Sequence, residues 1–440
     1  MTETIKVVYN WIGPNGPIIN TELPNILSFS AVAEGATATS HKFWTDDLYW
    51  RMFGPSKNFR LATGYDIRND EEFVYPYTLT WRIPFSTYFF ATSGILEYSH
   101  IPGRVLNAIR NYNGYILLEC GPETWVEPNQ LRDIHAYFAN AQVPLNKIIY
   151  LTGCMNVADV YNKWCSQNNI GTATHERINL IPYPLARYHM SHILNLNEHV
   201  EPVYRVETIP EKLFLCWNRR FRPHRSLLLL ALNKLGLVDR SYYSMGLVDP
   251  EFQSHPFEKA IPLDLNNSNQ YSLTNEDLDS VLTKLPLVID GQTEINEMCT
   301  NGTGKAKSFY ENSLVSIVTE TNWDLELLSS TEKSFKPFAE KHPFIIVGVC
   351  GALKSMHELG FKTFDEFWDE SYDEIIDFNE RLLKIIEVCK EIGTWDIEKI
   401  LDFKRRVKII VEHNYITMKN SNPSDISNQI ASIVKRQNTQ

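Results

Sequence analysis

The feature that most constrains this chain is the alternation of short, β-branched apolar runs with stretches of helical periodicity. The apolar runs lie at 5–10, 115–120, 147–152 and 178–183 in the first half, and at 212–218, 241–246, 285–290, 315–320 and 343–348 in the second. Helical periodicity is clearest at 224–237, 352–360 and 374–393. Strands that alternate with helices indicate parallel sheets with crossover connections, so the sequence predicts an α/β fold.

The length of the chain indicates two domains. A chain of 440 residues is longer than a domain with a single hydrophobic core usually is. The polar segment 195–212 lies before another predicted strand and is the best candidate for a linker. We therefore predict domains at 1–200 and 211–400 that face a central cleft, followed by a C-terminal helix and polar tail at 401–440. Because ligands bind beyond the carboxyl ends of open parallel sheets, functional residues are expected at strand ends. The tail at 420–440 is expected to be partly ordered at most.

The charge and the cysteines restrict the function classes. The net charge of −11 argues against a broad basic surface for nucleic acid, though not against a local basic groove. The seven cysteines are scattered and form no C-x-x-C, which predicts neither a zinc site nor disulfides. The N-terminus shows no signal peptide, and the apolar run 227–232 is too short to span a membrane. These features predict a cytoplasmic protein.

A cation-rich turn, "NRRFRPHR", directly follows the run 212–218 and precedes a helix. Its candidate anion-binding residues are Asn218, Arg219, Arg220, Arg222, His224 and Arg225. Pro223 suits the first helical turn, a helix N-terminus offers free N–H groups, and guanidinium groups bind phosphate in pairs of hydrogen bonds. The alternative is a solvated loop paired with the abundant carboxylates. We favour a phosphate site.

A second group follows the run 315–320. Thr319 and Glu320 end that strand, and Ser330 or Thr331 can cap the next helix. The first turns of this helix carry Glu332, Lys333 and Lys336. A lysine there opposes the helix dipole. By itself this pattern is an ordinary capped helix, but together with the arginine-rich turn it favours a diphosphate that bridges two strand-to-helix turns.

The segments "FYENS", "STEK" and "PFIIVG" resemble the motif set of α-1,3-fucosyltransferases. That family has the GT-B architecture of two Rossmann-like domains and transfers sugar from a nucleotide-diphosphate donor with inversion. The resemblance implies that Lys333 holds the diphosphate, Glu332 the ribose, and an arginine of 219–225 a phosphate, with Glu311 near the donor sugar. It covers roughly 212–350, and about ten extra residues, "TNWDLELLSS", interrupt the pattern. The C-terminal half is also similar to glycosyltransferase-like proteins of phages and large viruses.

Candidates for the acceptor side lie in the first half. "NWIGPNGP" follows the first strand, and Trp11, Gly13 and Gly16 could let a ligand approach the backbone. An inverting transfer needs a base, for which Glu123 and then Glu119 are chosen because "ECGPETW" ends a strand. Further candidates for this base are Glu34, His41 and Asp46.

Two acidic patterns invite a metal interpretation and are better explained as helices. "EDLDS" contains Asp-x-Asp, yet Thr274 predicts an N-cap with acids in the first turn. In 365–380 aspartates recur at four-residue steps, which predicts an amphipathic helix with a solvated acidic face. We predict no metal and no bound cofactor, since arginine and lysine can stabilise a leaving diphosphate.

These expectations combine into a metal-independent, inverting glycosyltransferase of GT-B type that uses a nucleotide sugar. The acceptor stays open between hydroxymethylcytosine in phage DNA, with glucose or arabinose as the sugar, and a surface glycan or protein. A non-catalytic nucleotide- or nucleic-acid-binding module is the alternative from another class. The oligomeric state is not predicted.

Overall fold

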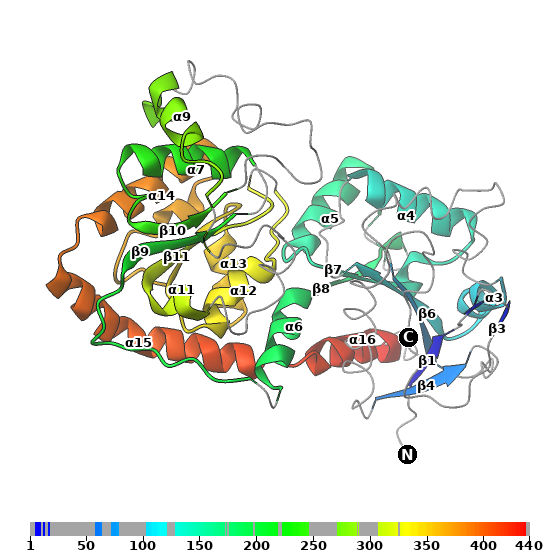
Figure 1. Cartoon of the computed structure of the whole chain (residues 1–440). Helices are drawn as coiled ribbons and strands as arrows, with labels where there is room; N and C mark the ends of the chain where they lie inside the picture. The colour runs from blue at the N-terminus through cyan, green and yellow to red at the C-terminus, as the bar shows by residue number, and fades with distance from the viewer. Residues whose placement is uncertain are drawn as a thin grey trace. The chain divides into compact units, whose positions relative to one another are not determined.

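The structure is a computed structural model of the chain. It describes residues 5–9, 12–13, 16–17, 58–63, 72–78, 103–120, 128–171, 173, 176–196, 199–218, 222–245, 271–287, 289, 307–323 and 326–436. The chain forms two compact units, Met1–His189 with Asn422–Gln440, and Met190–Ser421 (Figure 1). The first unit thus contains both ends of the chain, whereas the predicted domains were each one continuous segment of the sequence.

The first unit is built on a six-stranded parallel sheet with the order β4-β1-β5-β6-β7-β8. Its strands are β1 (Ile5–Tyr9), β4 (Phe59–Thr63), β5 (Phe73–Thr78), β6 (Gly114–Cys120), β7 (Ile148–Thr152) and β8 (Asn179–Pro182). The helices α3 (Gly103–Asn111), α4 (Pro128–Asn140) and α5 (Val157–Gln167) lie between strands in the sequence, and α6 (Leu185–Leu194) follows β8. The four strands predicted for this half are confirmed. The sequence did not predict β5, which carries Pro76 in its interior, a residue that argues against a central strand.

The C-terminal segment forms helix α16 (Ser424–Arg436) and completes the core of this unit. Ile426, Ile430 and Val434 recur at steps of four, and all three are buried against strand residues such as Leu117 and Leu151. The expectation of partial order at most was therefore wrong, because one apolar side of a short helix finds a sheet to cover.

The second unit contains a four-stranded parallel sheet with the order β10-β9-β11-β12. Its strands are β9 (Lys212–Trp217), β10 (Ser241–Ser244), β11 (Ser313–Thr319) and β12 (Phe344–Val347). Its helices are α7 (Pro223–Lys234), α9 (Asn275–Leu282), α11 (Lys307–Glu311), α12 (Glu332–Ala339), α13 (Ala352–Glu358), α14 (Phe378–Gly393) and α15 (Ile397–Lys419). Every residue of β11 and β12 is buried, as expected for a sheet covered on both faces. The predicted α/β class with parallel sheets is confirmed.

The connections run in opposite directions from the centre of this sheet. From β9 the chain passes through α7 to β10 on one side, and from β11 it passes through α12 to β12 on the other. Helix α7 contacts α9 and α14, whereas α12 contacts α15, so the two helices belong to separate layers (Figure 1). The strand order reverses between β9 and β11, and this is where open α/β sheets bind ligands beyond the carboxyl ends.

Two predicted elements differ in the structure. In 285–290, the described residues form an isolated bridge from Leu287 to Met245 and no strand. The acidic run 365–380 does not form the predicted helix; it contains turns and a short 3-10 helix, Ser371–Glu374, before α14 begins at Phe378. The physical reason is that Glu370 and Asp373 turn inward and accept hydrogen bonds from the backbone.

The helical interpretation of "EDLDS" is confirmed. Thr274 caps α9, and Thr274 and Asp277 form a reciprocal capping box. Among the described helices none is both long and apolar enough to cross a membrane.

Candidate functional site

The candidate site begins where β9 and β11 end side by side. Thr319 donates from Oγ1 to the Oδ1 of Asn218 at 2.5 Å. The backbone N–H of Asn218 also donates to Ser244 Oγ at 3.0 Å, which ties the end of β9 to β10. Asn218 and Thr319 are both buried. Two of the predicted residues thus meet at the reversal of strand order.

The first turn of α7 has one backbone N–H, that of His224, with no partner among the described residues, whereas the N–H groups of Arg225 and Ser226 donate to the Arg222 carbonyl at 3.0 Å. Arg222 occupies the N-cap with φ −146° and ψ 147°, and its side chain makes no capping hydrogen bond. Pro223 follows at the first helical position and has no N–H to donate. Within the part of the chain that the structure describes, the Arg222 guanidinium has no hydrogen-bond or ion-pair partner. This terminus therefore combines the positive end of the helix dipole with an available cation.

The two residues that follow point inward instead. His224 and Arg225 are 0% and 3% exposed. Arg225 donates from Nη2 to the carbonyl oxygens of Thr319 at 3.1 Å and Glu320 at 3.4 Å. The Nε2 of His224 lies 2.9 Å from the same Glu320 carbonyl. Both side chains therefore fasten α7 to the end of β11, a role that the sequence did not indicate.

The charge state of His224 follows from its surroundings. Burial, together with the positive charges of Arg225, Arg222 and Lys333, lowers the pKa of His224 well below 6.5, although the bond to the Glu320 carbonyl opposes this. The imidazole is therefore neutral at pH 7, with the proton on Nε2 because a carbonyl can only accept. Lys333 is linked to this ring through hydrogen bonds, since it donates to Thr331, Thr331 binds the Glu320 carboxylate, and the Glu320 carbonyl binds His224.

The second turn is organised by Glu320, which is 2% exposed. One carboxylate oxygen accepts from the backbone N–H of Thr331 at 3.0 Å and from Ser334 Oγ at 2.6 Å. The other accepts from Thr331 Oγ1 at 2.7 Å. Thr331, rather than Ser330, caps α12 by accepting from the N–H of Lys333. The residue that directly follows β11 thereby fixes the start of α12.

Three charged residues lie in the first turns of α12. Lys333 Nζ forms an ion pair with Glu332 at 3.1 Å and donates to Thr331 Oγ1 at 3.2 Å. Burial by itself would raise the pKa of Glu332, but the charges of Lys333 and Lys336 outweigh it and hold that pKa below its usual value. The Lys333 side chain keeps 25% of its surface exposed and can reach a bound anion.

Two residues of this edge were missed by the sequence analysis. Trp323 stacks on His224 with ring centroids 5.4 Å apart. Arg381, from α14, is 3% exposed and donates to the backbone carbonyls of Trp323, Gly348, Ile375 and Ile376 at 2.5 to 3.0 Å. Arg381 thus joins the turns that follow β11 and β12. In the sequence it reads as one more charge in an amphipathic helix, so no local pattern could reveal it.

The turn after β12 is closed by a carboxylate. Asp373 accepts from the backbone N–H groups of Leu353 at 2.9 Å and Lys354 at 3.0 Å, at the start of α13. Asp373 is 8% exposed, and burial raises its pKa in spite of these bonds. A helix terminus that already holds a carboxylate has no N–H groups left for a phosphate.

Several predicted residues are not brought to this group. Glu311 ends α11, just before β11 begins, so it lies at the opposite end of that strand from Thr319, and its carboxylate is 4.0 Å from Lys307 Nζ. Gly13 and Gly16 pair across a short antiparallel bridge between β2 (Ile12–Gly13) and β3 (Gly16–Pro17). Glu119 lies in β6, one residue before its end. The remaining predictions, Arg219, Arg220, Glu123 and Trp11, lie outside the described residues.

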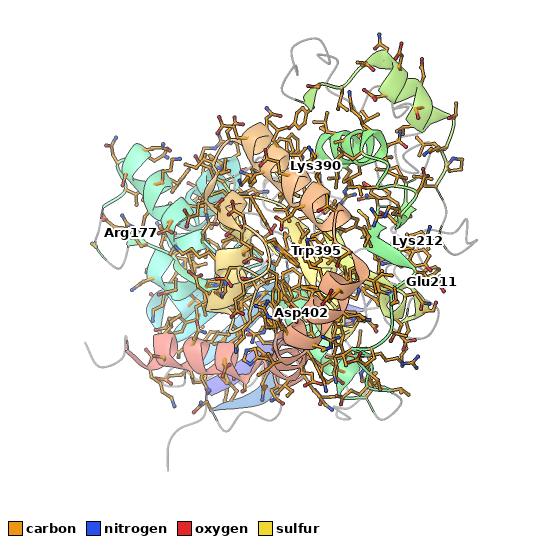
Figure 2. The ribbon with its side chains drawn as sticks, turned by 90° about the vertical axis from the view of Figure 1, so that its left-hand side faces the viewer. Arg177, Glu211, Lys212, Lys390, Trp395 and Asp402 are labelled. Carbon is orange, nitrogen blue, oxygen red and sulfur yellow. The ribbon has the colours of Figure 1, made fainter. Side chains whose placement is uncertain are left out.

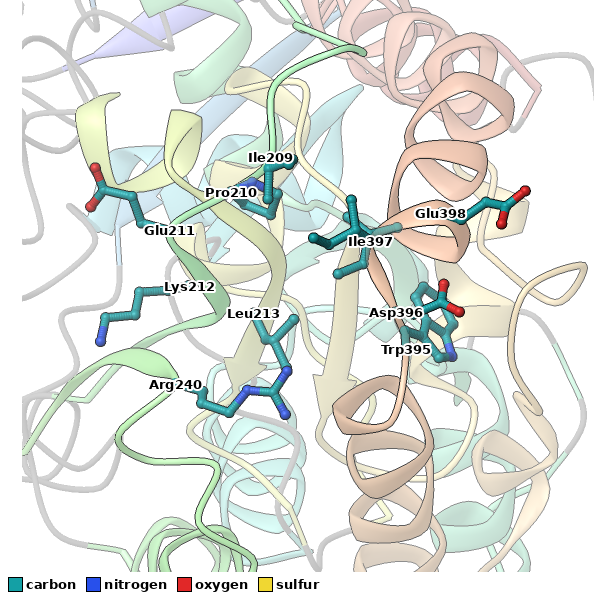
Figure 3. Close-up of a pocket in the computed structure, with 11 residues that line it drawn as sticks. Ile209, Pro210, Glu211, Lys212, Leu213, Arg240, Trp395, Asp396, Ile397 and Glu398 are labelled. Carbon is teal, nitrogen blue, oxygen red and sulfur yellow. The ribbon is translucent and has the colours of Figure 1, made fainter.

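A cavity of about 590 Å³ lies elsewhere in the second unit, at the amino-terminal end of β9. Ile397 points toward Pro210 across it, and Glu398 points away (Figure 3). Its basic groups are engaged: Lys212 donates to the Asp239 carbonyl and Arg240 to the Gly393 carbonyl. Figure 2 labels Glu211, Lys212 and Trp395 of this lining. An apolar wall with engaged cations does not suit a diphosphate. Nor do the described residues include a group of three or more His, Cys, Asp or Glu able to hold a metal ion.

No protein-family model matches the chain, and no curated protein matches it. The chain is similar to solved trehalose-phosphate synthases. An alpha,alpha-trehalose-phosphate synthase (UDP-forming) from Burkholderia vietnamiensis is 10% identical over 85% of this chain and 74% of that one, with a TM-score of 0.42. The enzyme from Burkholderia xenovorans is 10% identical over 84% and 74%, with a TM-score of 0.40. At these values the likeness assigns neither a reaction nor a substrate.

Proposed function

We propose that the chain is a GT-B-type glycosyltransferase whose second unit binds the diphosphate of a nucleotide-sugar donor. The observation that carries this proposal is the terminus of α7, with Arg222 at its N-cap and Lys333 joined to it through Thr331, Glu320 and His224, at the reversal of strand order between β9 and β11. A helix N-terminus flanked by cations favours a diphosphate over neutral ligands. The resemblance of "STEK" to the fucosyltransferase motif supports the same role for Lys333.

In the proposed reaction, negative charge develops on the leaving diphosphate, next to these cations. An acceptor hydroxyl attacks the anomeric carbon while the bond from that carbon to the diphosphate oxygen breaks. A base takes the hydroxyl proton, and the leaving diphosphate gains one negative charge. Arg222, Lys333 and the dipole of α7 would stabilise that charge in the transition state, without a metal ion. Glu123 and Glu119 remain the predicted candidates for the base.

We further propose that the acceptor is hydroxymethylcytosine in phage DNA, with a surface glycan or protein as the second candidate. The first rests on the similarity to phage glycosyltransferase-like proteins. The net charge of −11 requires that any DNA contact be local. Binding of hydroxymethylated duplex DNA that weakens steeply with salt would support the DNA acceptor. Absence of binding at low salt would leave the glycan or protein acceptor.

The test of the central proposal is a titration of the full chain with UDP, GDP, ADP and their sugar conjugates, followed by assays of sugar hydrolysis and transfer. We expect one nucleotide to bind and to raise the melting temperature. Arg222→Ala and Lys333→Ala should each weaken the affinity for that nucleotide about tenfold or more. Lys408→Ala, on the exposed side of α15, is the matched control. If no nucleotide or inorganic pyrophosphate binds the wild type, the proposal fails; binding without turnover would identify a non-catalytic nucleotide-binding module.

A further inference from the structure

The segment 321–330, which interrupts the resemblance to the fucosyltransferase motif, has a defined structure at both ends. It leaves β11 at Glu320 and returns at Thr331, and the Glu320 carboxylate binds both the N–H and the hydroxyl of Thr331. Inside the loop, Asn322 donates to Ser329 Oγ at 3.1 Å. Hydrogen bonds therefore hold the two ends of the segment together beside the candidate site.

This loop presents Trp323 next to the α7 terminus. The Trp323 ring lies on the His224 imidazole with an interplanar angle of 28°, and its carbonyl accepts from Arg381 at 2.5 Å. His224 is the second residue of α7. Trp323 is thus held in place through both its ring and its backbone. His224, on whose ring it stacks, is the residue that directly follows Arg222 and Pro223.

The indole is partly exposed although two aromatic side chains contact it. The His224 ring stacks on it, with centroids 5.4 Å apart, and Phe378 makes a T-shaped contact with it, with centroids 4.2 Å apart and an interplanar angle of 67°. Trp323 keeps part of its surface open to solvent, whereas His224 is buried.

We propose that Trp323 is the stacking surface for the nucleobase of the donor. This inference rests on the proposed function and narrows the donor to a nucleoside diphosphate, as opposed to a diphosphate that carries a lipid. A fixed and partly exposed aromatic ring beside a cationic helix terminus provides one surface for the base and one for the diphosphate. Base–aromatic stacking tolerates any base, because every base has a π-face.

The test compares inorganic pyrophosphate with UDP, GDP and ADP by calorimetric titration of the full chain, in wild type and in Trp323→Leu. We expect the preferred nucleoside diphosphate to bind wild type at least about tenfold more tightly than pyrophosphate. Trp323→Leu should remove most of that preference and leave pyrophosphate affinity within about twofold, which also shows that the variant is folded. Trp323→Phe should restore most of the nucleotide affinity.

The two proposals fail in different ways. If Trp323→Leu weakens pyrophosphate and nucleotide binding equally, or weakens neither, the stacking role is overturned while diphosphate binding stands. If wild type binds neither pyrophosphate nor any nucleoside diphosphate, the proposed function is overturned together with the stacking role. If a polyprenyl diphosphate binds more tightly than every nucleoside diphosphate, the donor class is wrong although the anion site is correct.

Discussion

The turns that follow β9 and β12 belong to the same edge of one sheet and lead into helices in the same way, yet they differ in what lies at the helix terminus. The α7 terminus carries Arg222, whose side chain makes no capping hydrogen bond. The α13 terminus is filled by the carboxylate of Asp373, which binds two backbone N–H groups. One terminus is left open and positive, and the other is satisfied from within the chain.

This difference shows how a sheet edge can be stable and still bind an anion. A capped terminus contributes about 1 kcal/mol to stability, and an uncapped one forgoes it. The Arg222 side chain makes no cap at the point where strand order reverses, whereas Asp373 caps the helix after β12, two strands along the sheet. Arg381 connects the two regions through Trp323, since it binds the carbonyl of Gly348 after β12 and that of Trp323, whose ring stacks on His224 of α7.

The largest effect is expected from breaking that connection. Arg381→Leu leaves the buried Gly348 carbonyl and three less buried carbonyl oxygens without this donor and should lower the free energy of unfolding by about 3 kcal/mol or more. Urea denaturation measures it. Arg405→Leu, which removes an arginine that is 51% exposed, should change stability by about 0.5 kcal/mol or less. Equal effects of the two variants would contradict the structural role of Arg381.

A smaller effect is expected from closing the open turn. Arg222→Asp places a good N-cap residue in extended backbone geometry and should stabilise the chain by about 1 kcal/mol. It should also weaken the binding of a nucleoside diphosphate about a hundredfold, because a cation becomes a like charge. Calorimetric titration and thermal unfolding measure the two quantities. Arg205→Asp makes the same charge change before β9 and should alter neither; unchanged affinity in Arg222→Asp would sink the comparison.

Opening the closed turn should have a more modest effect. Asp373→Ala removes both hydrogen bonds at the start of α13 and should lower the free energy of unfolding by about 1–2 kcal/mol. Donor affinity should stay within about twofold, since the α7 terminus is untouched. Asp373→Asn, which keeps one acceptor oxygen, should lose less stability. A gain of nucleotide binding in Asp373→Ala would show that an open terminus suffices without cations.

The smallest expected effect is on the pH dependence of stability, to which Glu370 and His224 contribute with opposite signs. Burial raises the pKa of Glu370, which binds the N–H of Phe364, to about 7. The folded state therefore holds a proton that the unfolded state loses near 4.5, so this contribution to stability is lost as pH rises through 7. For His224 the folded pKa lies below 6.5, so its contribution is lost as pH falls below that value.

Melting curves between pH 5 and 8 measure these slopes. Glu370→Gln should reduce the loss of stability on the alkaline side. His224→Phe should reduce the loss of stability on the acid side. The partly buried carboxyl of Glu340, whose pKa is also raised to about 7, adds a slope of the same sign as Glu370, so the slope of each variant is compared with that of the wild type. Opposite signs for the two variants would contradict the assignment of charge states.

Much of the fold could be predicted because burial leaves a local pattern. The β-branched run 315–320 predicted β11 and the apolar run 343–348 predicted β12, and Thr274 is the N-cap of α9 as predicted. The candidate site was predicted in part. The cation-rich turn and the lysine of α12 were found from their positions after strands, but the sequence could not tell that Arg225 and His224 turn inward while Arg222 does not.

The sequence by itself determined the alternation of strands and helices, the α/β class and the concentration of cations after β9, because these depend on neighbours within a few residues. The tertiary structure alone decided which termini are open. Asp373 caps a helix 20 residues before it, Arg381 binds a carbonyl 58 residues away, and α16 returns to the first unit. Such partners are set by crossover connections and sheet order, and no local periodicity encodes them.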